Sequence, residues 1–275
     1  MPKPVPVSCL QIDAFAERPY SGNPAAVCLL EGERDARWMQ AVAEEMNLSE
    51  TAFVRPGRDG FDLRWFTPAV EVDLCGHATL AAAHALWSEA RVPGDAEIRF
   101  QTRSGLLTAA RNGKLIELDF PATSPAASDL DDAEVRSLGD ALGVVPKRVV
   151  RSAFDLLVEV GTDREVREAR PDFRRLGALD CRGVIVTSTS DDPRFDFVSR
   201  FFAPGVGVNE DPVTGSAHCC LGPYWGERLG KRDMSAFQAS SRGGVVRVRV
   251  SGDRVILGGH AVTIFRGELT EAAAD

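Results

Sequence analysis

Asp73-Leu-Cys-Gly-His-Ala-Thr-Leu-Ala-Ala-Ala-His-Ala-Leu-Trp87 is the stretch that decides the fold. It begins with polar residues, turns at Gly76, and continues through small and apolar residues. A helix that is apolar nearly all round is buried on every side, whereas a surface helix alternates polar and apolar faces. The sequence therefore predicts a central helix from Gly76 to about Ala90. Its N-terminal turn presents unpaired N–H groups, and the partial positive charge there favours an anion.

The same arrangement recurs about half the chain later, in Asn209-Glu-Asp-Pro-Val-Thr-Gly-Ser-Ala-His-Cys-Cys-Leu-Gly-Pro-Tyr-Trp225. An acidic turn again precedes a glycine, Gly215, and a helix of small residues that we expect to reach about Leu229. Around each turn the sequence predicts an outer helix, two strands, the turn, the central helix and short strands. This order indicates an internal repeat of a whole domain. Two unrelated buried helices in one α/β protein are the alternative at this stage.

The domain organisation follows from length and from one linker-like segment. A chain of 275 residues suits one large or two medium domains. The segment 121–128 is rich in Pro, Ser and Ala, which is typical of a boundary. We therefore predict an N-terminal domain over 1–120 and a C-terminal domain over 121–275, with a strand near 260–267 as a candidate to complete the first. The segment 164–176 is expected to be mostly helical, and the tail from Glu268 is expected to be disordered.

Charge and composition exclude several classes of partner. A net charge of −8 argues against a nucleic-acid or acidic-membrane partner. No apolar run reaches the roughly 18 residues that indicate a membrane span. The six cysteines show no C-x-x-C spacing, and the N-terminus lacks the apolar core of a secretory signal. Reduced thiols in a cytoplasmic protein fit these features.

The two turns carry groups suited to proton transfer beside a carboxylate. If both helix N-termini face one cleft, backbone N–H groups at Gly76–His77 and Gly215–Ser216 would hold a carboxylate without an arginine. The groups that could move a proton or orient the substrate there are Glu50, His77, Asp211 and Ser216.

Other interpretations of these residues stay open. Glu50 stands at the start of an apolar strand and, taken alone, also fits a solvated loop carboxylate or a local cap with Asn47. Cys75 sits at a helix N-terminus, where a thiol could act as a nucleophile or base. His77 and His84 share a helix face, but no third ligand follows at metal spacing, so the sequence predicts no metal site.

Four ordered motifs resemble those of the PhzF family, the phenazine-biosynthesis isomerase-like proteins. They are Asp13-Ala-Phe with Ser21-Gly-Asn-Pro24; Asn47-Leu-Ser-Glu50-Thr-Ala-Phe; Asp73-Leu-Cys-Gly-His77-Ala-Thr; and Glu210-Asp-Pro-Val-Thr-Gly-Ser216-Ala. The resemblance covers essentially the whole chain. It implies the α+β fold of diaminopimelate epimerase, in which two pseudo-symmetric domains each form a mixed β-barrel around a central helix, with the active site between them.

The resemblance also implies roles for single residues. In the phenazine enzyme the glutamate of the Asn-Leu-Ser-Glu motif moves a proton between carbons of a cyclic dihydro-hydroxyanthranilate without a cofactor, and Glu50 occupies that position. The implied catalytic residues are Glu50, His77 and Asp211, and the implied substrate-binding residues are Asn23, Cys75, Gly76, Gly215 and Ser216. The protein is then expected to be a cytoplasmic homodimer that uses no cofactor or metal, binds a small-molecule carboxylate, and has no nucleic-acid or membrane partner.

The predicted function is a cofactor-independent isomerase that acts on a small carboxylate, including a cyclic amino or hydroxy acid, by glutamate-mediated proton transfer. Related epimerases and racemases use one cysteine from each domain. Cys75 matches the first, and there the chain departs from the phenazine enzyme, which has a small non-thiol residue. The second turn reads Asp211-Pro-Val-Thr-Gly215 and offers no matching thiol. A Cys75-assisted epimerase or racemase and a non-catalytic carboxylate-binding protein are the alternatives.

Overall fold

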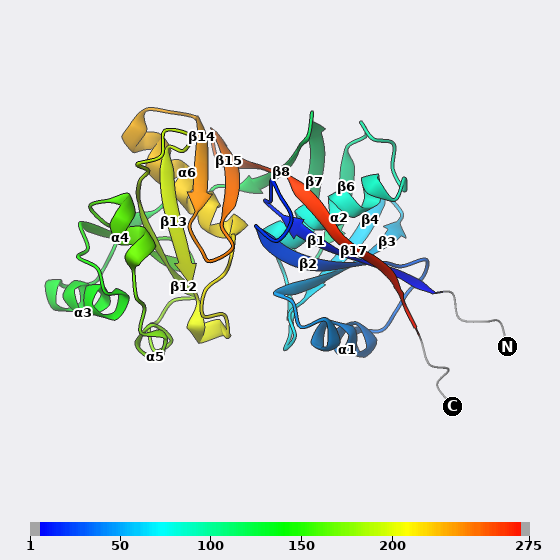
Figure 1. The fold of residues 1–275 in the computed structure, drawn as a ribbon, viewed down its shortest axis with the longest axis horizontal. Coiled ribbons are helices and arrows are strands. Elements are labelled where there is room, and N and C mark those ends of the chain that lie inside the picture. Colours follow the sequence, from blue (N-terminus) through cyan, green and yellow to red (C-terminus); the bar gives the residue numbers. More distant parts are fainter. Residues whose placement is uncertain (1–5, 271–275) are drawn as a thin grey trace. The chain divides into compact units, whose positions relative to one another are not determined.

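The structure is a computed structural model that describes residues 6–270 (Figure 1). The chain divides into two compact units, and each is described separately. The first comprises the described residues up to Asp119 together with those from Gly258, and the second comprises Phe120–Leu257. The last long strand of the chain, β17 (Ala261–Leu269), therefore belongs to the first unit, where it pairs antiparallel with β1 (Val7–Ala14).

The first unit is a mixed sheet with two helices. Between β1 and β17 its elements are β2 (Asn23–Leu29), α1 (Ala36–Met46), β3 (Glu50–Gly57), β4 (Gly60–Phe66), β5 (Glu71–Val72), α2 (Gly76–Ser88), β6 (Ile98–Thr102), β7 (Gly105–Asn112) and β8 (Leu115–Pro121). The predicted central helix is confirmed as α2, most of whose residues are buried. It packs against β1, β2, β3 and β17, so the alanine-rich sequence is covered by the sheet.

The outer helix α1 covers another part of this sheet. The carboxylate of Asp35 caps its N-terminus by accepting a hydrogen bond from the Trp38 backbone N–H at 2.8 Å. Asn47 ends the helix in the left-handed conformation, with a φ of 49°. Beneath it lies a buried cluster that includes Met39, Phe53 and Phe66. Because Asn47 serves as the end of α1, the chain turns directly into β3 at Glu50.

The second unit repeats this organisation. Its elements are β9 (Ala126–Ala127), α3 (Asp132–Leu142), β10 (Arg148–Arg151), β11 (Asp155–Glu159), α4 (Asp163–Glu168), α5 (Phe173–Leu176), β12 (Gly183–Thr189), β13 (Phe197–Phe202), a 3₁₀ turn (Pro204–Val206), α6 (Gly215–Leu229), β14 (Asp233–Gln238), β15 (Gly244–Ser251) and β16 (Arg254–Gly259). The second predicted central helix is confirmed as α6, which packs on β14 and β15. Gly222 permits this close packing, since a Cβ there would lie 2.9 Å from Cγ1 of Val248.

The pattern of strand pairing is the same in both units. In the first, the pairs β1–β2, β2–β3, β3–β4, β4–β6 and β6–β7 run antiparallel, parallel, antiparallel, parallel and antiparallel. In the second, the pairs β10–β11, β11–β12, β12–β13, β13–β14 and β14–β15 run in the same order. The first parallel crossover carries α1 or α4 and α5, and the second carries α2 or α6. The whole-domain repeat predicted from the two turns is therefore present in the topology.

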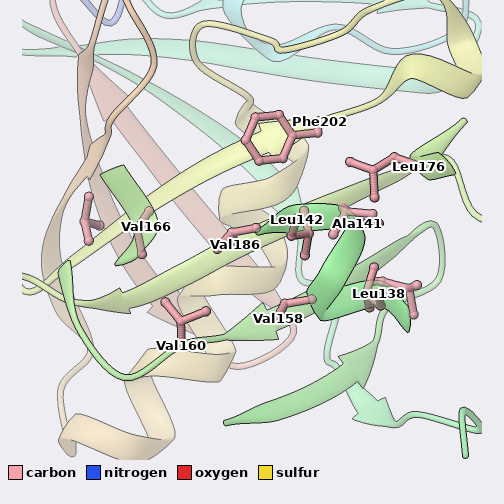
Figure 2. Close-up of a cluster of buried hydrophobic side chains, with 12 residues drawn as sticks. Leu138, Ala141, Leu142, Val158, Val160, Val166, Leu176, Val186 and Phe202 are labelled. Atoms are coloured by element: carbon pink, nitrogen blue, oxygen red, sulfur yellow. The ribbon is translucent and has the colours of Figure 1, made fainter. Parts of the chain in front are cut away.

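The core of the second unit includes a cluster that the outer helices share with the sheet. Figure 2 shows Leu138, Ala141 and Leu142 of α3 beside Val158 of β11 and Val186 of β12. The capping box of Asp131 and Glu134 starts α3, and Gly143 ends it with a φ of 70°. These local signals hold α3 in the register that buries its apolar face.

The segment 164–176 is mostly helical, as expected, but it is divided into two short helices, α4 and α5, because Pro171 lacks a backbone N–H and follows the break at Ala169. One expectation was wrong in detail. The tail expected to be disordered from Glu268 is ordered as far as Leu269, since both residues pair with β1. The rest of that tail, residues 271–275, lies outside the described residues. None of the described helices combines the length and apolar character needed to cross a membrane.

Candidate functional site

The first cluster of predicted site residues forms where three elements of the first unit begin. Asn23 is the first residue of β2, Glu50 is the first residue of β3, and His77 lies in the first turn of α2. Parallel pairing of β2 with β3 sets Ala25 opposite Glu50. The starts of these two strands therefore lie side by side, which brings Asn23 and Glu50 to the same edge.

His77 is the centre of this cluster. Its Nε2 atom lies 3.1 Å from Oε2 of Glu50. On the other side of the ring, Nδ1 lies 3.1 Å from Nδ2 of Asn23 and 3.5 Å from Sγ of Cys75. The neutral ring accepts at Nδ1 from Asn23 and carries its proton on Nε2, whereas the charged ring is protonated on both nitrogens. In both states Nε2 carries a proton.

The Glu50 and His77 side chains are close, but no aligned hydrogen bond joins them. The Oε2 and Nε2 atoms are both buried, and neither has an aligned hydrogen-bond partner among the described residues. The Glu50 side chain as a whole is 19% exposed. A buried carboxylate oxygen without a directed hydrogen bond is costly to leave in that state, which marks this oxygen as a candidate to contact a bound substrate. The solvated-loop and local-cap interpretations of Glu50 do not fit this placement.

Burial and neighbouring groups shift the two other titratable residues of the cluster. Burial, and then the charge of Glu50, raises the pKa of the Cys75 thiol. Burial alone would lower the pKa of His77, but Cys75 and Glu50 act in the opposite sense and raise that pKa well above 6.5. Since the thiol of Cys75 is itself neutral, the Glu50 carboxylate is the partner that stabilises the charged imidazole ring.

The same three residues could in principle bind a metal ion. One donor atom each from Glu50, Cys75 and His77 lies within 4.8 Å of the others. However, the two short contacts use opposite nitrogens of the ring, Nδ1 toward Cys75 and Nε2 toward Glu50. One imidazole offers a single nitrogen to a given metal, so these contacts fit a chain of proton donors and acceptors better than a chelate.

The second cluster lies at the start of α6 in the second unit. Oδ2 of Asp211 accepts a hydrogen bond from the Thr214 hydroxyl at 2.6 Å. Gln238 joins both ends of the turn, because its Oε1 accepts from the Thr214 N–H at 2.8 Å and its Nε2 donates to the Asp211 carbonyl at 2.7 Å. This network fixes the acidic turn ahead of Gly215.

Two residues of this cluster were not predicted from the sequence. Arg182 donates a hydrogen bond to Oγ of Ser216 at 3.0 Å. The same guanidinium makes a two-point ion pair with the buried carboxylate of Asp155, at 2.9 Å and 2.6 Å. The expectation that no arginine is needed near the second turn therefore misses a cation that contacts Ser216. The only sequence signal was a charged residue directly before the apolar strand that became β12.

The two helix starts share one further feature. The residues that precede Gly76 and Gly215 are Cys75 and Thr214, and neither makes a side-chain cap hydrogen bond to its helix. Helices whose first N–H groups lack such a cap leave these groups available to an anion. Thr214 stands at the position before α6 that Cys75 holds before α2. The second unit therefore has a threonine where a two-thiol enzyme would have its second cysteine.

The structure thus gathers the predicted residues into two groups. Asn23, Glu50, Cys75, Gly76 and His77 are together in the first unit, and Asp211, Gly215 and Ser216 are together in the second. A hollow of about 520 Å³ in the first unit contains none of them; its walls include His84, Arg111, Lys114 and His260. His84 contacts Thr263 and His218 contacts the Thr214 carbonyl, in keeping with structural roles for both.

Comparison with known proteins identifies the family. The model of phenazine biosynthesis-like proteins matches residues 12–267. An uncharacterized isomerase of Halalkalibacterium halodurans is 54% identical over 258 residues, which cover 94% of this chain and 96% of that protein. The crystal structure of a PhzF-family phenazine biosynthesis protein from Enterococcus faecalis has a TM-score of 0.91 and 41% identity, covering 97% of this chain and 100% of that chain. A probable proline racemase from Agrobacterium radiobacter, 11% identical, covers 98% of this chain and 94% of its own with a TM-score of 0.65, and so shares the fold alone. The chain has the diaminopimelate epimerase-like fold and belongs to the PhzF family.

Proposed function

We propose that the protein is a cofactor-independent isomerase that moves a carbon-bound proton within a small carboxylate substrate. Glu50 removes the proton from one carbon and returns it to another, while a double bond shifts between them. The reaction is balanced without a redox partner, because the substrate loses one carbon-bound proton and gains one, and the proton held on the Glu50 carboxyl exchanges with solvent before it is returned. Relatives of this chain are named isomerases, although uncharacterized ones.

One observation carries this proposal. The Oε2 atom of Glu50 is buried and lacks an aligned hydrogen-bond partner among the described residues, and it lies 3.1 Å from Nε2 of His77. A general base must have a free lone pair within reach of the proton that it takes, and a nearby donor can stabilise charge during the transfer. Glu50 offers such a lone pair, and Nε2 of His77 offers such a donor.

The remaining predicted residues have supporting roles in this proposal. Asp211 orients the amino or hydroxyl group of the substrate, and Ser216 binds its carboxylate with the backbone N–H groups that follow Gly76 and Gly215. Asn23 and Cys75 hold the His77 ring. The two clusters belong to separate compact units, and their joint action on one substrate is part of the proposal.

A Cys75-assisted epimerase is the second candidate, since Sγ of Cys75 lies 3.5 Å from Nδ1 of His77. Two observations count against it. Burial raises the pKa of the Cys75 thiol, which disfavours the reactive thiolate. In addition, the matching position before α6 is Thr214, so a two-thiol mechanism lacks its second thiol.

A screen of small carboxylic acids in heavy water tests the proposal. The protein is incubated with each acid, and deuterium incorporation and rearrangement are measured by mass spectrometry and proton NMR. An isomerase yields a rearranged product, and the incorporation of deuterium into that product depends on Glu50. A binding protein gives saturable ligand binding without deuterium incorporation, and an epimerase inverts a stereocentre with exchange at that carbon alone.

We further propose a homodimer located in the cytoplasm, where the six free cysteines stay reduced.

A further inference from the structure

We propose that Arg182 is a positioning residue that makes the hydroxyl of Ser216 a hydrogen-bond donor toward the carboxylate of the substrate. The inference rests on the proposed function, because it assumes that Ser216 meets the substrate. It adds to that function two residues, Arg182 and Asp155, and a reason why the site selects a carboxylate over a neutral group.

The orientation of Arg182 is fixed by its partners. Its Nε donates to Oδ1 of Asp155 at 2.9 Å and its Nη2 donates to Oδ2 at 2.6 Å, which is a two-point pairing. The guanidinium carbon also lies 5.2 Å from the ring centre of Phe154 and 5.6 Å from that of Phe201. The planar group is therefore held against rotation from several sides, so its contact with Ser216 has a defined direction.

That contact determines which way the hydroxyl proton of Ser216 points. Nη2 of Arg182 donates to Oγ of Ser216 at 3.0 Å, and Arg has only donors. A serine hydroxyl has one proton and two lone pairs, so a donor that occupies a lone pair turns the proton away from itself. No acceptor for this proton lies among the described residues. Ser216 is also the one partly exposed residue between Val213 and Cys220.

A group that accepts hydrogen bonds and carries negative charge fits this hydroxyl best. A carboxylate is acceptor-only when ionised, and hydrogen bonds to charged groups are about twice as strong as those between neutral groups. The neighbouring guanidinium adds a positive charge, although its pairing with Asp155 offsets part of it. The neutral amide of the same acid accepts less strongly and brings donors of its own.

Lysine cannot reproduce the arrangement. Its ammonium is a compact charge on a flexible stem. It lacks the planar guanidinium, in which two nitrogens donate to Asp155 and one of these two also donates to Ser216. The substitution Arg182→Lys therefore keeps the charge but loses the fixed direction. It separates positioning of the Ser216 proton from a general attraction for anions.

The test compares binding of an acid and its neutral amide by calorimetry. The probes are 3-hydroxyanthranilate, a cyclic amino acid of the class expected for the family, and its neutral amide, 2-amino-3-hydroxybenzamide. The wild-type protein is compared with Arg182→Lys, Arg182→Gln and Ser216→Ala, and Arg174→Gln is the control because that arginine is exposed. Since Arg182→Gln leaves Asp155 buried and unpaired, the pair Asp155→Asn with Arg182→Gln is made as well, and each variant is checked for a cooperative thermal transition.

The wild-type protein and Arg174→Gln should bind the acid more tightly than the amide. Loss of one hydrogen bond to a charged group should weaken acid binding by about tenfold or more, with little change for the amide. Ser216→Ala, Arg182→Lys and the Asp155–Arg182 pair variant should all show this loss. Combining Ser216→Ala with Arg182→Lys should add nothing further, because the two residues act as one unit.

Three results would overturn the inference: no preference of the wild type for the acid, full retention of that preference in Arg182→Lys, or equal weakening for acid and amide in the Arg182 variants. The last result is what a purely structural role of Arg182 would produce. Failure of the proposed function looks different, since the wild type would then bind carboxylates without any deuterium incorporation.

Discussion

Oε2 of Glu50 lies 3.1 Å from Nε2 of His77, yet neither buried atom has an aligned hydrogen-bond partner among the described residues. A carboxylate and an imidazole that are buried together usually form a directed hydrogen bond. Here the carboxylate keeps a free acceptor and the ring keeps a free donor. A substrate that lies against both groups would satisfy them at once, which makes this pair the place to test function first.

Glu50→Gln should abolish most of the turnover while ligand binding is retained. Glutamine keeps the shape and hydrogen-bonding capacity of the side chain but removes the group that accepts and returns the proton. General acid–base steps contribute about 10²–10⁴-fold to rate, so turnover should fall by at least about 10²-fold. The measurement is deuterium incorporation from heavy water, with calorimetry for binding. Glu45→Gln, an exposed change on α1, is the matched control and should stay at the wild-type rate.

Cys75→Ala should cost little in turnover. Its thiol is buried and held neutral by a raised pKa, so it contacts the ring of His77 without acting as a base. We expect a fall of less than about tenfold, roughly 1.4 kcal/mol of barrier. The rate is measured with the same exchange assay. An inactive Cys75→Ala protein beside an active Glu50→Gln protein would replace the isomerase proposal with the thiol-based epimerase.

Much of the fold could be predicted from local sequence, but the features that depend on contacts between distant segments could not. The apolar, small-residue patterns of α2 and α6 determine that both helices are central, and the glycines at Gly76 and Gly215 mark their first residues. The order of elements was enough to predict a domain repeat. The alternation of parallel and antiparallel pairs was not predictable, because strand pairing depends on contacts between distant segments.

The site residues within short motifs could likewise be predicted, whereas contacts between distant residues could not. Glu50, Cys75 and His77 were predicted from motifs, and the structure confirms that they lie together. The partnership of Arg182 with Asp155 and Ser216 was missed, since these contacts join residues 27 and 34 positions apart in sequence. No periodic pattern or short motif records such a pairing. The family resemblance did not supply it either, because Arg182 lies outside the four motifs.

A homodimer is the expected assembly. This prediction depends on family resemblance, because no sequence segment marks an interface. Light scattering coupled to gel filtration at micromolar concentration should give about twice the chain mass of 29.7 kDa. A clean monomer over that concentration range would contradict the prediction, and it would leave the arguments about Glu50 and Arg182 unaffected.

His218 should make the second unit sensitive to acid. The ring is fully buried in α6, its Nδ1 donates to the Thr214 carbonyl at 2.8 Å, and burial lowers its pKa from 6.5 to about 4. Between these pH values the unfolded chain binds a proton that the folded chain does not, so the free energy of unfolding falls as pH falls from 6.5 toward 4. At pH 5 this residue alone accounts for a loss of about 2 kcal/mol relative to pH 7. Urea unfolding at both pH values should show a smaller acid loss for His218→Gln than for wild type, and equal losses would refute the assignment.

His77 should titrate in the opposite sense, and its midpoint should depend on Glu50. Because the pKa of His77 is raised above 6.5 in the folded protein, the stabilisation that its charge provides is complete below pH 6.5 and is lost as pH rises through the folded pKa. NMR of histidine-labelled protein should therefore place the midpoint of His77 above 6.5. In Glu50→Gln the carboxylate that stabilises the charged ring is gone, and burial then acts against that charge, so the midpoint should move down. Glu45→Gln should leave it in place. If the midpoint of His77 were the same in wild type and Glu50→Gln, the two side chains would not be coupled, and the proton-transfer role of the pair would have to be abandoned.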